Sequence, residues 1–108
     1  MAQVSLTRRA VAELLATALL VAAVVGSGIA AQTLSPNDVG LQLLENTLAT
    51  AGALFAIIVV FGPISGSHLN PVVTVADCSI GRRPWRDAAA YVPAQVVGAI
   101  SGAIIANV

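Results

Sequence analysis

A polar stretch in the middle of the sequence constrains the fold more than any other feature. Residues 62–84, GPISGSHLNPVVTVADCSIGRRP, interrupt a chain that is otherwise almost continuously apolar. The interiors of the three apolar runs around it contain only two charged residues, Glu13 and Glu45. At about 1.5 Å per helical residue, each run is long enough to cross a hydrocarbon layer of roughly 30 Å. The sequence predicts membrane-spanning helices over about 8–31, 41–62 and 86–108.

Composition supports the same class. Of the 108 residues, 57% are hydrophobic and only 9% are charged. A soluble domain of this size would need a polar surface that so few charges cannot cover. We therefore expect a multi-pass integral membrane protein whose surroundings are a lipid bilayer, and no nucleic-acid partner.

The first apolar run also has features of an export signal. The stretch TRRAVAELLATALLVAAVVGSGIAAQ carries twin arginines, an apolar segment and small residues near Ala31. However, the apolar segment is longer than in a usual signal, contains Glu13, and is followed by two further spans. These three features favour a span that is retained.

The arginines predict how the chain is oriented in the membrane. With three spans, the N-terminus and the 63–87 connection lie on the same side. All five basic residues then share that side: Arg8, Arg9, Arg82, Arg83 and Arg86. By the positive-inside rule, the N-terminus is cytoplasmic and the C-terminus is outside, in a plasma membrane of bacterial type. Trp85 is expected to lie at the membrane interface.

The 63–80 segment predicts a loop that enters the membrane and returns. Asn70 is a favoured N-cap, Pro71 suits the first helical position, and Gly81 ends the helical pattern. The intervening ten residues span about 15 Å, roughly half a bilayer. We expect residues 63–69 to be extended and the half-helix to point its N-terminus toward the membrane centre. Irregular backbone at that depth must be buried in protein or line a wet cavity.

The predicted fold class is thus an all-α membrane protein with three transmembrane helices and one re-entrant half-helix, as a single unit over 1–108. The alternative is an ordinary cytoplasmic loop with a short surface helix. The absence of charged residues over 62–76 disfavours it, because a surface helix normally carries more charge.

Three sequence motifs resemble those of the aquaporin, or major intrinsic protein, family. SGSHLNPVVT is similar to the family's first pore loop, S-G-x-H-x-N-P-A-V-T. AELLAT resembles its A-E-x-x-x-T, and YVPAQVVGA its Y-x-x-A-Q-x-x-G-A, in the same order along the chain. The resemblance covers essentially the whole chain but only the N-terminal half of a family member. A full member has two three-span repeats of inverted topology.

The resemblance assigns roles to the loop. Asn70 would donate its side-chain amide to the permeating molecule, and Pro71 would begin the half-helix and help to fix the loop. The carbonyl groups of Gly66, Ser67 and His68 would form a series of acceptors along the pore. The positive ends of paired half-helices would disfavour cations.

The resemblance also implies supporting residues in the spans. Glu13 and Gln95 would brace the loop by accepting from or donating to its backbone. Thr50 would lie near an outer constriction and suggest a wide filter. The alternative for Glu13 is a simple ion pair with Arg9. Small residues predict close helix contacts, namely Gly98-x-x-x-Gly102, Gly26, Gly28, Gly52, Ala56 and Ala94.

The implied function is passive transport of water or small uncharged solutes such as glycerol or metalloid acids. Pore formation would require a complementary C-terminal half, and the family suggests a tetramer. The alternatives are a non-conducting remnant or a small membrane assembly or regulatory subunit. We expect no catalytic residue, metal or cofactor: a metal at His68 would lack further ligands, and Asp77 reads as a solvated or packing residue. Val72 departs from the family's usual Ala.

Overall fold

The computed structural model describes residues 5–108, which form four helices and no strand. Three helices are long and apolar enough to cross a membrane: α1 (Leu6–Leu34), α2 (Val39–Ser65) and α4 (Trp85–Ala106). The fourth, α3 (Pro71–Ser79), is short. The predicted all-α membrane fold is confirmed, and the helices depart from the predicted bounds by only a few residues at each end.

Three of the helices begin where a side chain caps their first turn. Ser5 Oγ accepts from the Arg8 N–H at 3.3 Å, and Asp38 Oδ1 accepts from the Leu41 N–H at 2.9 Å. At α3, Asn70 Oδ1 accepts a hydrogen bond of 2.8 Å from a backbone N–H of the first turn. These caps satisfy donors that the helix itself leaves unpaired, so the helix starts are encoded locally.

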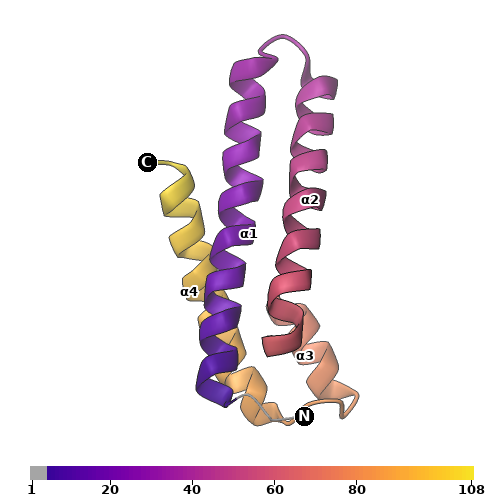
Figure 1. Ribbon diagram of the computed structural model, residues 1–108, viewed down its shortest axis with the longest axis vertical. Helices are drawn as coiled ribbons and strands as arrows, with labels where there is room; N and C mark the ends of the chain where they lie inside the picture. Colours follow the sequence, from indigo (N-terminus) through magenta and orange to yellow (C-terminus); the bar gives the residue numbers. More distant parts are fainter. Residues whose placement is uncertain (1–4) are drawn as a thin grey trace.

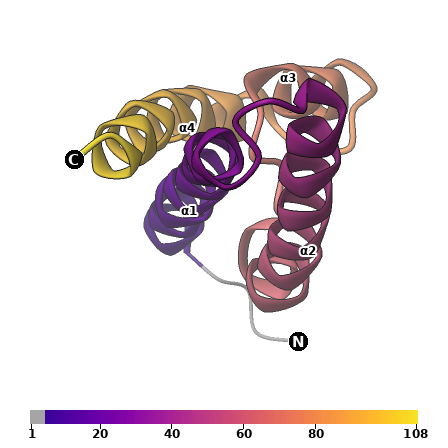
Figure 2. The same ribbon diagram turned by 90° about the horizontal axis from the view of Figure 1, so that it is seen from above.

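Helix α1 lies at the centre of the bundle. It packs against α2 on one side and α4 on the other, while α3 packs along α4 (Figures 1 and 2). The described chain is elongated, with extents of 49 × 24 × 24 Å. Since α1 contacts both other long helices, a polar group on α1 can reach the loop and α4 at once.

Two glycines allow α4 to approach α1 closely. A Cβ on Gly98 would overlap the backbone carbonyl of Leu14, and one on Gly102 would overlap that of Ala18. The helix contact predicted for this Gly-x-x-x-Gly pair is therefore confirmed.

The other glycines for which a helix contact was predicted do not lie against a neighbouring backbone. Gly28 lies against the Asn46 side chain, where a Cβ would be 3.3 Å from Nδ2. At Gly26 and Gly52 nothing in the described chain lies within 4 Å of a Cβ. The predicted helix contact is wrong at these two positions within this chain, because they lie on helix faces with no neighbour in it.

The connection between α2 and α3 is shorter than expected. Helix α2 continues through Pro63 to Ser65, and Gly66, with φ of 90°, ends it in the left-handed conformation. The predicted extended segment from residue 63 is therefore wrong for its first three residues. Pro63 has no N–H to donate to the carbonyl four residues earlier, so α2 passes through it with one hydrogen bond fewer in its last turns.

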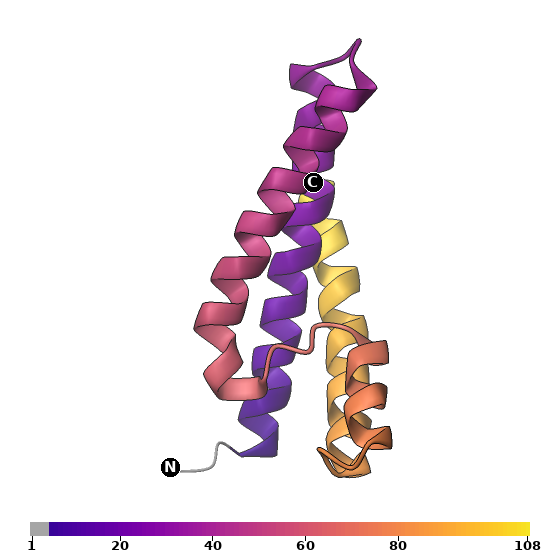
Figure 3. The same ribbon diagram turned by 90° about the vertical axis from the view of Figure 1, so that its right-hand side faces the viewer.

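Residues 66–70 then turn inward along the long axis, and α3 returns to the end at which α4 begins (Figure 3). Leu69 is buried and packs with Ala16 and Ile57. His68 is also buried, with 8% of its surface exposed. An ordinary surface loop would not bury these residues, so the chain here folds back into the bundle.

Candidate functional site

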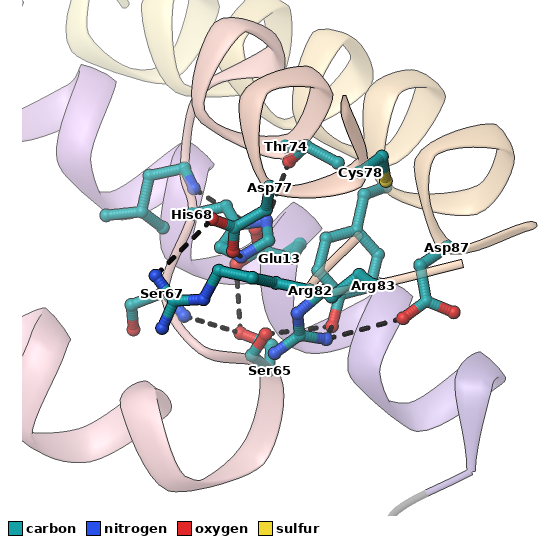
Figure 4. Close-up of polar contacts among 12 residues, drawn as sticks. Glu13, Ser65, Ser67, His68, Thr74, Asp77, Cys78, Arg82, Arg83 and Asp87 are labelled. Carbon is teal, nitrogen blue, oxygen red and sulfur yellow. Dashed lines mark hydrogen bonds and ion pairs between the residues drawn. The ribbon is translucent and has the colours of Figure 1, made fainter. Parts of the chain in front are cut away.

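The loop is attached to the bundle through the carboxylate of Glu13. Glu13 is fully buried on α1. Its Oε1 accepts from the Leu69 backbone N–H at 3.1 Å and from Gln95 Nε2 at 2.9 Å. Its Oε2 accepts from Ser65 Oγ at 2.9 Å, and Figure 4 shows the side chains gathered around the loop. Glu13 thus receives donors from α2, the loop and α4.

The alternative of an ion pair between Glu13 and Arg9 is wrong. Arg9 Nη1 lies 2.7 Å from Asp87 Oδ2, and Asp87 is 2% exposed. Arg83 Nη1 lies 3.4 Å from the same oxygen. This triad joins the start of α1 to the start of α4 and leaves Glu13 to the loop.

Two residues of the loop that are not glycine adopt the left-handed backbone conformation. Ser67 has φ of 49° and Leu69 has φ of 62°. Such conformations cost about 1–2 kcal/mol per residue in an L-amino acid. The Ser67 N–H donates to Ser65 Oγ at 3.2 Å, and the Leu69 N–H donates to Glu13. The hydrogen bonds from α1 and the end of α2 sustain this strained backbone.

Several polar groups of the loop have no hydrogen-bond partner in the described chain. Within residues 5–108, the carbonyl groups of Gly66, Ser67 and His68 accept no hydrogen bond. Asn70 is exposed: its Oδ1 caps α3, and its Nδ2 has no partner in the described chain. Pro71 occupies the first helical position. The site therefore offers adjacent acceptors and one donor, which suits exchange of hydrogen bonds with a small neutral polar molecule.

His68 is held through both ring nitrogens. Nδ1 lies 2.9 Å from Thr74 Oγ1, and Nε2 lies 2.9 Å from Asp77 Oδ2. Gln95 Nε2 donates to Thr74 Oγ1 at 2.9 Å. Gln95 makes no hydrogen bond to the loop backbone itself, so the direct contact expected of it is absent; it reaches the loop through Glu13 and Thr74.

Sequence reasoning missed several of these residues. Asp77 is an imidazole partner and not merely a solvated or packing residue. Tyr91 donates its hydroxyl to the Ser65 carbonyl at 2.8 Å, and Arg83 donates to that hydroxyl at 3.2 Å. One signal was available: Thr74 and Asp77 are three residues apart on the half-helix and so share a face.

Thr50 is separate from the loop. It lies on α2, half-buried, and its enclosed Oγ1 has no hydrogen-bond partner among the described residues. The structure therefore does not bring it together with Asn70 through any hydrogen bond. Within residues 5–108, no group of three or more His, Cys, Asp or Glu side chains could hold a metal ion.

Three apolar helices around a strained polar loop and a half-helix define an integral membrane protein with a buried, braced loop. The family model described as Major intrinsic protein matches residues 1–108, and the chain belongs to that family.

Individual relatives agree with this assignment. The chain is 51% identical over 107 residues to "Aquaglyceroporin AqpS" of Rhizobium meliloti (strain 1021), covering 99% of this chain and 46% of that protein. It is 39% identical over 118 aligned positions to "Aquaporin AqpM" of Methanothermobacter marburgensis, covering 94% and 47%. It is 45% identical over 58 residues to "Glycerol uptake facilitator protein" of Bacillus subtilis, covering 54% and 20%. The chain spans about half the length of the first two relatives.

Proposed function

We propose that this chain forms the first half of a channel for water or small uncharged solutes, and that the pore requires a complementary half on the same or another polypeptide. The names of the similar proteins point to water and glycerol as solutes. Because the chain covers less than half of the first two relatives, the activity of a whole channel is a proposal for it.

The observation that carries this proposal is the set of free polar groups on the loop. A small neutral molecule that leaves water loses hydrogen bonds, and acceptor carbonyls beside a donor amide can replace them. The carbonyls of Gly66, Ser67 and His68 and the amide of Asn70 supply both kinds of group. The N-terminus of α3 adds a partial positive charge that disfavours cations.

The need for a complementary half follows from exposure. Asn70 is exposed, and Val72 beside it is 74% exposed. Lipid would leave the polar groups of the loop unpaired, at a cost of several kcal/mol each. A second half would cover this face, with Val72 at the contact between the two half-helices and Thr50 near the outer constriction.

The arrangement in the membrane belongs to the same proposal. By the positive-inside rule, the arginines favour a cytoplasmic N-terminus and an outside C-terminus, in a plasma membrane of bacterial type. Family membership favours association of complete channels into a tetramer.

Substitution of Asn70 tests the pore directly. In vesicles that contain this chain with a complementary half, Asn70→Asp should lower water or glycerol permeability at least about tenfold, equivalent to roughly 1.4 kcal/mol of barrier. The change replaces a donor by an acceptor and adds negative charge. Asn107→Asp is the matched control, because Asn107 is exposed at the end of α4, away from the loop. Equal permeability of the two variants would refute the role of Asn70.

A further inference from the structure

The backbone of His68 has no hydrogen bond that fixes it. Neither its N–H nor its carbonyl pairs with another group in residues 5–108. Its neighbours Ser67 and Leu69 both have left-handed backbone conformations and are held by Ser65 and Glu13. The position of His68 between them depends on its imidazole, which is buried and packs edge-on against Tyr91 at 5.4 Å between ring centres.

The hydrogen-bond partners assign the imidazole tautomer. Gln95 Nε2 donates to Thr74 Oγ1, so the Thr74 hydroxyl hydrogen is free to donate to His68 Nδ1. A hydroxyl can also accept a second hydrogen bond, so this contact by itself is compatible with either tautomer, and the contact at Nε2 decides between them. The proton of a neutral ring is on Nε2, 2.9 Å from Asp77 Oδ2, and a carboxylate can only accept there. Donors and acceptors are consistent along the whole series from Gln95 to Asp77.

From these hydrogen bonds, which run from Gln95 through Thr74 and His68 to Asp77, we propose that Asp77 is a positioning residue for the loop. Its carboxylate fixes His68 in the Nε2-protonated tautomer and orients the ring, and the ring in turn holds the backbone that presents the carbonyls of residues 66–68. The part of this inference that concerns the pore rests on the proposed function. The part that concerns His68 does not.

Other charged and titratable groups lie near the contact between Asp77 and His68, and one of them, Arg82, offers a control variant. Arg82, on the turn after α3, lies 4.0 Å from Asp77 Oδ1 and its side chain is 72% exposed. An exposed pair at this distance contributes little. On α4, Tyr91 faces the ring, and its hydroxyl accepts from Arg83. On α1, Glu13 reaches the series only through the Gln95 amide. The Nε2 contact is therefore specific to Asp77.

The test is nitrogen NMR of 15N-histidine in the membrane-embedded chain together with its complementary half. His68 is the only histidine in this chain, and a His68→Gln sample identifies its resonances. The native protein should show one neutral tautomer, protonated at Nε2. Asp77→Leu and Asp77→Ala should each lower the ratio of the two tautomers at least about tenfold, because a hydrogen bond to a charged group contributes that much or more.

Two variants separate this contact from general effects. Asp77→Asn retains an oxygen that can accept from Nε2, so the Nε2-protonated tautomer should persist. Arg82→Gln removes only the exposed partner and should leave both tautomer and permeability unchanged. In a channel that Asn70→Asp blocks, Asp77→Leu should lower permeability several-fold, and Asp77→Asn should restore most of it.

A tautomer that stays on Nε2 in both Asp77→Leu and Asp77→Ala would overturn the inference. A changed tautomer with unchanged permeability would overturn the link from His68 to the pore. If the unmodified channel does not conduct at all, the proposed function fails, and the NMR measurement still decides whether Asp77 positions His68.

Discussion

At the scale of single residues, Glu13 is the centre of the site. A buried carboxylate costs several kcal/mol unless it is paired or well supplied with hydrogen bonds. Glu13 receives three, from Ser65 on α2, Leu69 in the loop and Gln95 on α4. One side chain therefore ties three elements together, and the strained loop depends on it.

Removal of this carboxylate should harm folding more than selectivity. Glu13→Ala removes the acceptor of three buried hydrogen bonds and leaves the Leu69 N–H without a partner, and we expect a loss of about 1–3 kcal/mol of stability. Glu45→Ala is the matched control, because Glu45 accepts a single hydrogen bond, from Ser35, at the far end of α2. Expression level and melting temperature in detergent are the measurements. Equal melting temperatures of the Glu13 variant and the unmodified chain would contradict the bracing role.

Individual residues also differ in whether their contacts could be predicted from the sequence. The start of α3 was predictable because Asn70 and Pro71 act on their own helix turn. The partners of Asp77 and Asp87 were not predictable, because each pairs with a residue that only the folded chain brings near. Glu13 was predicted as a brace through the family resemblance, and no local pattern indicates which donors it receives.

At the scale of helices, the contact between α1 and α4 depends on close backbone approach. In a membrane, helices gain little from the hydrophobic effect and pack through small residues. Gly98 and Gly102 supply these on α4, whereas Gly26 and Gly52 have no neighbour in the described chain. The four-residue spacing marks Gly98 and Gly102 in the sequence, but only the packing shows that Gly26 and Gly52 have no neighbouring helix in the described chain.

This difference gives a paired prediction. Gly98→Ala and Gly102→Ala each place a Cβ against the α1 backbone, and overpacking of this kind costs about 1–3 kcal/mol. Gly26→Ala and Gly52→Ala should be neutral, or stabilising by up to about 1 kcal/mol, since alanine favours helices. Thermal unfolding of the four variants in one detergent measures the effect. Similar losses in both pairs would argue against the close α1–α4 contact.

At the scale of the whole molecule, the arginines lie at one end. Arg9 and Arg83 share Asp87, so the start of α1 and the segment before α4 are in contact. The other three arginines are close to these two in the sequence. Arg8 is next to Arg9, and Arg82 and Arg86 lie within three residues of Arg83. The charge asymmetry predicted from the sequence is thus an asymmetry of the folded chain, and from the positive-inside rule we expect one orientation in nearly every copy.

Tags on the C-terminus test this orientation. In right-side-out vesicles or intact cells, a tag after Val108 should be accessible from outside in nearly all copies. Arg82→Gln with Arg86→Gln should increase the inverted fraction, because it removes two of the five basic residues. A native chain labelled equally from both sides would contradict the predicted topology.

We propose that the loop forms a pore only when a complementary half covers its exposed face. Copies that all insert in one orientation place every half-helix at the same membrane face, so no second loop meets Asn70 from outside. Stopped-flow light scattering tests this with vesicles that are empty, contain this chain alone, or contain it with a complementary half. We predict that the chain alone matches empty vesicles in water and glycerol permeability, and that the two halves together raise it. Clear permeability of the chain alone would show that no complementary half is needed.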